Sequence, residues 1–370
     1  MLIKFDKYFF FILVLYNLII LPIFLILNSL TINPDSVNIY TYSKMVNNGE
    51  VFSLPYPPLY PSLVSLYTYF LGIQYVAVFG IVLASIFLVM MSLYINLTDS
   101  IRTASIFILI MNSVPFNFFS ELFYRTYTFQ LVIVVFFALI GFFSIVTQSG
   151  LLNQPLYLGI TVLGILTTII YFPTLMLLVL LSYVLTSRKN IFKVFLKLGF
   201  YIGFLTLLGA ILIFGYGFES FPQFYKLLSS HVDIYVLVND RNLIQDFFSF
   251  KSSSILDVNN PLNIFIFLIS IFLISIGILF RKFSEPSSNR FLLTLSYLLI
   301  FVTYTGIFEF QVVAGRAIWF LMLVFCVIIS KFIIYILIKN MISEKSIIIL
   351  LTFFLFLNFV THAILPVKLT

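Results

Sequence analysis

Long apolar runs separated by short polar segments follow one another along almost the whole chain. Most are close to the roughly 20 residues that a helix needs to cross a hydrocarbon core of about 30 Å. They are continuously apolar rather than alternating, which favours helices over a β-barrel. The sequence therefore predicts an all-α fold, a polytopic bundle of about 11 transmembrane helices that forms a single transmembrane domain over residues 1–370. The predicted spans lie near 8–30, 74–97, 103–120, 127–147, 156–170, 172–186, 195–216, 261–280, 291–308, 317–337 and 346–363.

Two segments between the runs, residues 31–73 and 217–260, are long enough to hold structure of their own. In the first, Asn33 is placed to cap a short helix, and Asn48-Gly49 is placed to end it. The apolar stretch Leu59–Leu71 follows, about a dozen residues long and too short to cross a bilayer. We therefore expect two short helices at the outer surface and no span within this loop.

Composition and charge agree with a lipid environment. Apolar residues make up 62% of the chain and charged residues 9%, against about 45–50% and 25% in soluble domains. With the N-terminus in the cytoplasm, the predicted spans place 13 of the 20 basic residues inside, which follows the positive-inside rule and accounts for the net charge of +7 without a nucleic-acid partner. We expect an integral protein of the cell membrane. The inner basic residues are Lys4, Lys7, Arg102, Arg188, Lys189, Lys193, Lys197, Arg281, Lys282, Arg290, Lys331, Lys339 and Lys345.

Few residue types are available for metal or redox chemistry. The single cysteine, Cys326, lies in an apolar run and permits no internal disulfide. The two histidines, His231 and His362, are too far apart in sequence to indicate a pair of metal ligands. No nucleotide-binding glycine loop occurs. The residues themselves predict no cofactor.

Acidic residues gather on the predicted outer side, and Asp35 is the first of them along the chain. It falls in the first turn of the expected surface helix, just beyond the first span. A carboxylate there is stabilised by the helix dipole, by about 0.3–1 kcal/mol. Alternatively, Asp35 is a general base that accepts a proton from an acceptor hydroxyl at the membrane surface. The local pattern leaves both interpretations open.

The order of features in and around the first loop is similar to that of a known family. An anchor helix is followed by Asp35 in a surface helix, by Asn48-Gly49, by the stretch Tyr56-Pro57-Pro58-Leu59-Tyr60-Pro61 and by a long span. This order resembles the GT-C superfamily, the integral membrane glycosyltransferases that use polyprenyl-phosphate-linked sugars, such as protein O-mannosyltransferases and lipid A aminoarabinose transferases. The resemblance covers residues 1–150 best, and residues 160–190 and 310–335 less well.

The resemblance implies roles for particular residues. Asp35 corresponds to the essential acidic residue of the first outer loop, and Glu121 is the nearest substitute for a second acidic residue that many members carry ahead of the fourth span. Ser36 follows Asp35, whereas an acidic residue at that position would help to bind a divalent metal. A divalent metal stays an alternative, but this difference from the family pattern weakens it. Gly315-Arg316 opens a late span as a Gly-Arg pair does in several members.

The candidates for substrate binding each have a plainer interpretation. Arg316 and Arg125 are suited to hold a lipid phosphate, but Arg316 also fits an interfacial anchor, and Arg125 can pair with Glu121 four residues earlier. Tyr40 is a candidate for stacking on a sugar, although tyrosine is common at membrane interfaces. His231 and Arg241 are candidate substrate contacts in the second outer loop, or are incidental loop residues.

The expected function is therefore that of an inverting membrane glycosyltransferase. It would transfer a sugar from a polyprenyl-phosphate donor to a lipid, glycan or protein acceptor at the outer face. The alternative from another class is a transporter or lipid-linked-sugar flippase without catalysis, which would show broken helices and polar residues at mid-membrane. A third alternative is a polysaccharide polymerase or ligase of another membrane fold, which would lack the Asp-bearing first loop.

Overall fold

The described part of the chain is helical. The computed structural model describes residues 2–20, 22–23, 41, 43–45, 47–49, 59–71, 76–112, 173–186, 261–305, 311–339, 346, 349, 352–353 and 356, and among these there is no strand. The all-α prediction is confirmed for these residues. The chain forms two compact units, the first made of Met1–Val51, Pro57–Phe136 and Ile329–Thr370, and the second of Phe52–Tyr56 and Phe137–Ile328.

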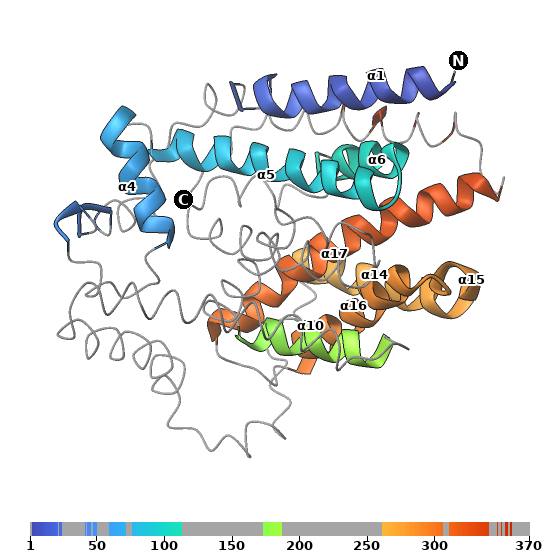
Figure 1. The fold of residues 1–370 in the computed structure, drawn as a ribbon. Coiled ribbons are helices and arrows are strands. Elements are labelled where there is room, and N and C mark those ends of the chain that lie inside the picture. The colour runs from blue at the N-terminus through green and yellow to red at the C-terminus, as the bar shows by residue number, and fades with distance from the viewer. Residues whose placement is uncertain are drawn as a thin grey trace, which may run out of the picture. The chain divides into compact units, whose positions relative to one another are not determined.

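In the first unit, three helices pack side by side (Figure 1). Helix α1 spans Leu2–Leu15 and continues as one π-helical turn, η1, over Tyr16–Ile20. Helix α5 spans Val76–Thr98, and α6 spans Ile101–Met111. Both α1 and α5 contact α6, and η1 contacts α5.

Helix α6 begins at a capped turn and is buried almost all round. Ser100 precedes it with extended backbone (φ −161°, ψ 158°), and its hydroxyl accepts a hydrogen bond from the backbone N–H of Thr103, the usual arrangement at a helix N-cap. Every residue from Thr103 to Asn112 is buried. A helix that is apolar on all sides belongs in the interior of a large protein or of a membrane bundle.

The first loop contains the two helical segments that the sequence predicts. One ends at Asn48-Gly49, where Gly49 has φ 78°, the left-handed conformation in which glycine often terminates a helix. The other, α4, spans Leu59–Leu71 and contacts α5. At 1.5 Å per residue its 13 residues extend about 20 Å, well short of a hydrocarbon core.

In the second unit, α16 (Ser287–Thr305) packs against α10 (Pro173–Thr186) and α14 (Pro261–Leu279), and the short α15 (Arg281–Ser284) joins α14 to α16. The contact between α14 and α16 is tight at Gly277. A Cβ added there would lie 1.7 Å from the hydroxyl oxygen of Tyr297, which donates a hydrogen bond to the backbone carbonyl of Leu273 at 3.3 Å.

Helix α17 spans Gln311–Ile338, the longest described element. The predicted spans at 74–97, 172–186, 261–280, 291–308 and 317–337 each overlap a helix. The predicted span at 103–120 corresponds to the shorter α6, which ends at Met111, and the first predicted span begins as α1 six residues earlier than expected and includes a π turn that the apolar pattern did not reveal. The predicted spans at 127–147, 156–170 and 195–216 and the second loop at 217–260 lie outside the described residues. Within the described residues, one helical stretch, Phe320–Ile338, is both long and apolar enough to cross a membrane. The shorter apolar stretches are Lys7–Ile20, Ile101–Met111 and Ile266–Leu279.

Candidate functional site

The structure describes little of the site that the sequence predicts. Asp35, Glu121, Tyr40, Arg125, His231 and Arg241 lie outside the described residues. Arg316 lies in the second turn of α17, where the helix is described and the side chain is not. The convergence of these residues therefore stays a prediction. Among the described residues of the first unit, polar side chains of separate helical segments meet at the following three places, among others.

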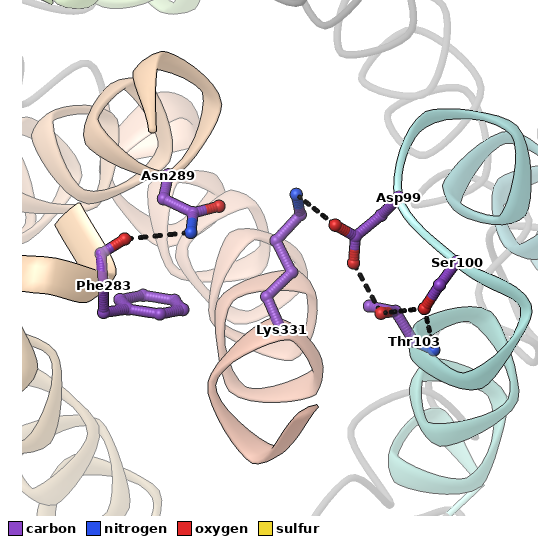
Figure 2. A network of polar contacts seen from close by, with 6 residues as sticks. All are labelled: Asp99, Ser100, Thr103, Phe283, Asn289 and Lys331. Carbon is purple, nitrogen blue, oxygen red and sulfur yellow. Dashed lines mark hydrogen bonds and ion pairs between the residues drawn. The ribbon is translucent and has the colours of Figure 1, made fainter. Parts of the chain in front are cut away.

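The first contact is an ion pair between α17 and the turn that joins α5 to α6 (Figure 2). The Nζ atom of Lys331 lies 3.5 Å from Oδ1 of Asp99. The Lys331 side chain is only 8% exposed and that of Asp99 is 33% exposed. A nearly buried ammonium group is costly unless a carboxylate or other acceptor faces it, and Asp99 provides that partner.

Neighbouring hydroxyls orient the Asp99 carboxylate. Its second oxygen, Oδ2, accepts a hydrogen bond from the Thr103 hydroxyl, which lies 2.8 Å from the hydroxyl of Ser100 (Figure 2). The backbone N–H of Asp99 donates to the carbonyl of Ile95 at 2.9 Å. The cap of α6 and the ion pair are thus one network, so the carboxylate that faces Lys331 is fixed by the same residues that start the helix.

The second contact is a buried pair of asparagines between η1 and the end of α6. Asn17 is 0% exposed, and its Nδ2 atom donates to the carbonyl of Leu13 at 2.8 Å. Its Oδ1 atom accepts a hydrogen bond of 3.0 Å from Nδ2 of Asn112. Polar side chains among apolar helices hold helices together when they satisfy each other, and π turns of this kind are frequent at functional positions.

The third contact joins the two helical segments of the first loop. The hydroxyl of Ser65 in α4 donates a hydrogen bond to Oδ1 of Asn47, and the backbone N–H of Asn48 donates to the carbonyl of Lys44 at 2.9 Å. Ser43 is buried, whereas Lys44 is exposed. The helical segment that ends at Asn48 is therefore held against α4.

Sequence reasoning missed Lys331, Asp99, Asn17 and Asn112 as interacting residues. A signal existed for two of them, because Lys331 and Asn17 interrupt apolar runs, and polar residues in such runs are seldom without a partner. Their partners follow from no sequence pattern. Asp99 lies close in sequence to Arg102, which the predicted topology places on the cytoplasmic side together with Lys331, so their pairing agrees with that topology. Among the described residues, no three His, Cys, Asp or Glu side chains lie together in a way that could hold a metal ion.

The described residues thus form packed helices, and the ion pair and the asparagine pair each join separate helical segments. Comparison of the chain with protein-family models, with curated proteins and with solved structures gives no match.

Proposed function

We propose that this chain is a polytopic integral membrane protein of about 11 spans, with its N-terminus in the cytoplasm and its first loop outside. The match between apolar runs and described helices supports this arrangement. Large apolar side chains are also exposed along whole helix faces, which fits contact with lipid. On α1 these include Phe11 and Ile12, on η1 they include Ile19, and on α14 they include Phe267, Leu268 and Ile278.

We propose that the protein transfers a sugar from a polyprenyl-phosphate donor to an acceptor hydroxyl at the outer face. The acceptor oxygen attacks the anomeric carbon as the bond from that carbon to the phosphate oxygen breaks, which inverts the configuration. Asp35 takes the proton of the acceptor hydroxyl, and the phosphate leaves with its negative charge on the lipid. Glu121 assists or binds the sugar, and Arg316 and Arg125 bind the departing phosphate.

The observation that carries this proposal is the organisation of the first loop. A helical segment of this loop ends at Gly49 with φ 78°, and Asn47 in its last turn accepts a hydrogen bond from Ser65 of α4. Helix α4 in turn contacts α5. The contact between these two helical segments of the loop supports a role for Asp35 at a site, because a general base must be fixed relative to the hydroxyl that it deprotonates.

The substitution Asp35→Asn tests the proposal. Asparagine keeps the size of the side chain and still favours a helix start, so stability should change by about 1 kcal/mol or less. It cannot accept the proton, and general base catalysis is worth about 10²–10⁴ in rate. We expect purified Asp35→Asn protein in lipid to insert normally and to lose incorporation of sugar from a polyprenyl-phosphate donor.

Glu50→Gln is the matched control, because it removes another carboxylate of the same loop. It should retain transfer. Full activity of the Asp35→Asn protein, at normal expression, would leave Asp35 as a helix-terminal carboxylate and remove the main support for the enzyme.

A transporter or lipid-linked-sugar flippase is the second candidate, and one observation favours it. The π turn at Tyr16–Ile20 interrupts the first apolar helix and holds the buried pair of Asn17 and Asn112. Interrupted helices with polar groups inside the bundle are typical of transport proteins. Movement of a labelled lipid-linked sugar across vesicles, equal for the unaltered and Asp35→Asn proteins and without transfer by either, would favour this alternative.

A further inference from the structure

Helix α17 is longer than a membrane requires. Its 28 residues extend about 42 Å at 1.5 Å per residue, whereas a hydrocarbon core is about 30 Å thick. An apolar helix of this excess length can slide or tilt without exposing much additional apolar surface. Length and hydrophobicity alone therefore do not fix the depth at which α17 crosses.

Only two charged residues, Arg316 and Lys331, lie within α17. They are 15 positions apart, about 22 Å along the helix axis. This spacing is shorter than the hydrocarbon core, so both residues cannot lie at opposite boundaries of the membrane. One of the two charged residues must therefore lie inside the hydrocarbon core, or must reach the membrane surface with an extended side chain.

The structure supplies a partner for one of these charges. Lys331 is nearly buried, and its ammonium group faces the carboxylate of Asp99 at 3.5 Å. The hydroxyls of Thr103 and Ser100 keep that carboxylate in place. A charged residue paired in this way can stay within the hydrocarbon region, and a buried polar group can fix the register of one helix against another.

We propose that Asp99 is a positioning residue that sets the depth of α17 through Lys331. Asp99 holds Lys331 inside the hydrocarbon core, close to its cytoplasmic boundary. Arg316 can then lie at the outer boundary of the core, where a donor phosphate would lie. The second part of this inference rests on the proposed function, whereas the depth of α17 does not. The ion pair near the inner end of α17 would thus set the position of Arg316 near its outer end.

The test measures the depth of α17 directly. Cys326→Ala removes the only cysteine, and single cysteines are then introduced at each position from Val312 to Ile318. A membrane-impermeant maleimide added outside the vesicles labels the positions that lie beyond the outer boundary. In the Asp99→Asn protein, Lys331 loses its partner and moves toward the inner surface. The limit of labelling, which is the last position along α17 that still reacts with the maleimide, should then shift toward Gln311 by up to about one turn, 3.6 residues.

A second variant distinguishes positioning from simple stabilisation. Adding Lys331→Met to Asp99→Asn removes the unpaired charge, so the limit of labelling should return to its original position. A pair that only stabilises the fold would show no such reversal. The exchange Asp99→Lys with Lys331→Asp rebuilds the pair and should also preserve the original limit, which keeps the test decisive if the single variant fails to fold. Lys282→Gln, an exposed charge in α15, is the matched control and should leave labelling unchanged.

An unchanged limit of labelling in folded Asp99→Asn protein would overturn the proposal. A transfer assay on the same variants separates it from the proposed function. If both hold, Asp99→Asn raises the KM for the lipid-linked donor, and Lys331→Met in the same chain lowers it again. If the unaltered protein transfers no sugar, the proposed function fails, while the labelling still decides the role of Asp99.

Discussion

At the scale of single residues, the buried pair of Asn17 and Asn112 shows that polar side chains can lie in the apolar interior when they are hydrogen-bonded to each other. Asn17 and Asn112 are both buried, and each satisfies part of the other's hydrogen-bonding capacity through the 3.0 Å contact between them. Leaving one member of such a pair alone costs about 1–3 kcal/mol, since the remaining group is buried without its partner. Replacing both by apolar groups of similar shape removes that penalty.

We therefore predict that Asn17→Ala lowers stability by about 1–3 kcal/mol. The double variant Asn17→Leu with Asn112→Leu should recover most of the loss. Thermal unfolding of the purified proteins in one detergent measures both effects. Ser182→Ala, in α10 of the other unit, removes a buried hydroxyl bonded to its own helix and serves as the control, with an expected change below that of Asn17→Ala. A double variant no more stable than Asn17→Ala would show that the pair has another role.

The same residues show how far the sequence can predict this protein. Asn48-Gly49 ends a helix as expected, because the left-handed conformation strongly favours glycine. The contact of Asn17 with Asn112 could not be predicted, because 95 residues separate them and only packing brings them together. Lys331 stood out as a charge in an apolar run, yet nothing local indicates Asp99 as its partner. The roles of Asp35 and Glu121 stay predictions.

At the scale of elements, apolar runs and prolines locate helices well. Helix α10 begins at Pro173 and α14 at Pro261, as proline at the first helical position favours. The π turn in the first helix was missed because one additional residue in a turn leaves an apolar run unbroken. The packing between elements could not be predicted from the sequence either. The close contact of Gly277 with Tyr297 is an example.

We predict that Gly277→Ala destabilises the contact of α14 with α16. The added Cβ would lie 1.7 Å from the Tyr297 hydroxyl oxygen, so the ring must move, and overpacking of this kind costs about 1–3 kcal/mol. Tyr297→Leu should make room and reduce the penalty of Gly277→Ala. Ser275→Ala, in the same helix, is the control. Equal thermal stabilities of Gly277→Ala and the unaltered protein would contradict the packing described here.

At the scale of the whole molecule, the predicted side of every later predicted span depends on whether α4 crosses the membrane. Its 13 residues are too few, and Tyr69 near its end is 80% exposed, as suits an aromatic residue at the interface. Its apolar face also exposes Leu66 and Phe70. These features favour a helix that lies at the surface.

We predict that single cysteines at Asn48 and at Gln74, on either side of α4, both react from outside the cell with an impermeant maleimide. A cysteine at Ser187, next to the basic residues assigned to the cytoplasm, is the control and should not react. These variants also carry Cys326→Ala. Reaction at Asn48 but not at Gln74 would mean that α4 crosses the membrane, and it would reverse the orientation of all the spans that follow.

The π turn of the first helix has a consequence for comparing this chain with others. The buried positions Phe10, Leu13 and Asn17 follow each other at intervals of three and four, whereas Ile20 in the π turn, three residues after Asn17, is exposed. Intervals of three and four are those of a regular helix, and one additional residue rotates everything beyond it by about 100°. The two halves of the helix thus keep separate registers. A regular helix of a distant relative would align with both halves only if a gap of one residue were placed between Leu15 and Ile20.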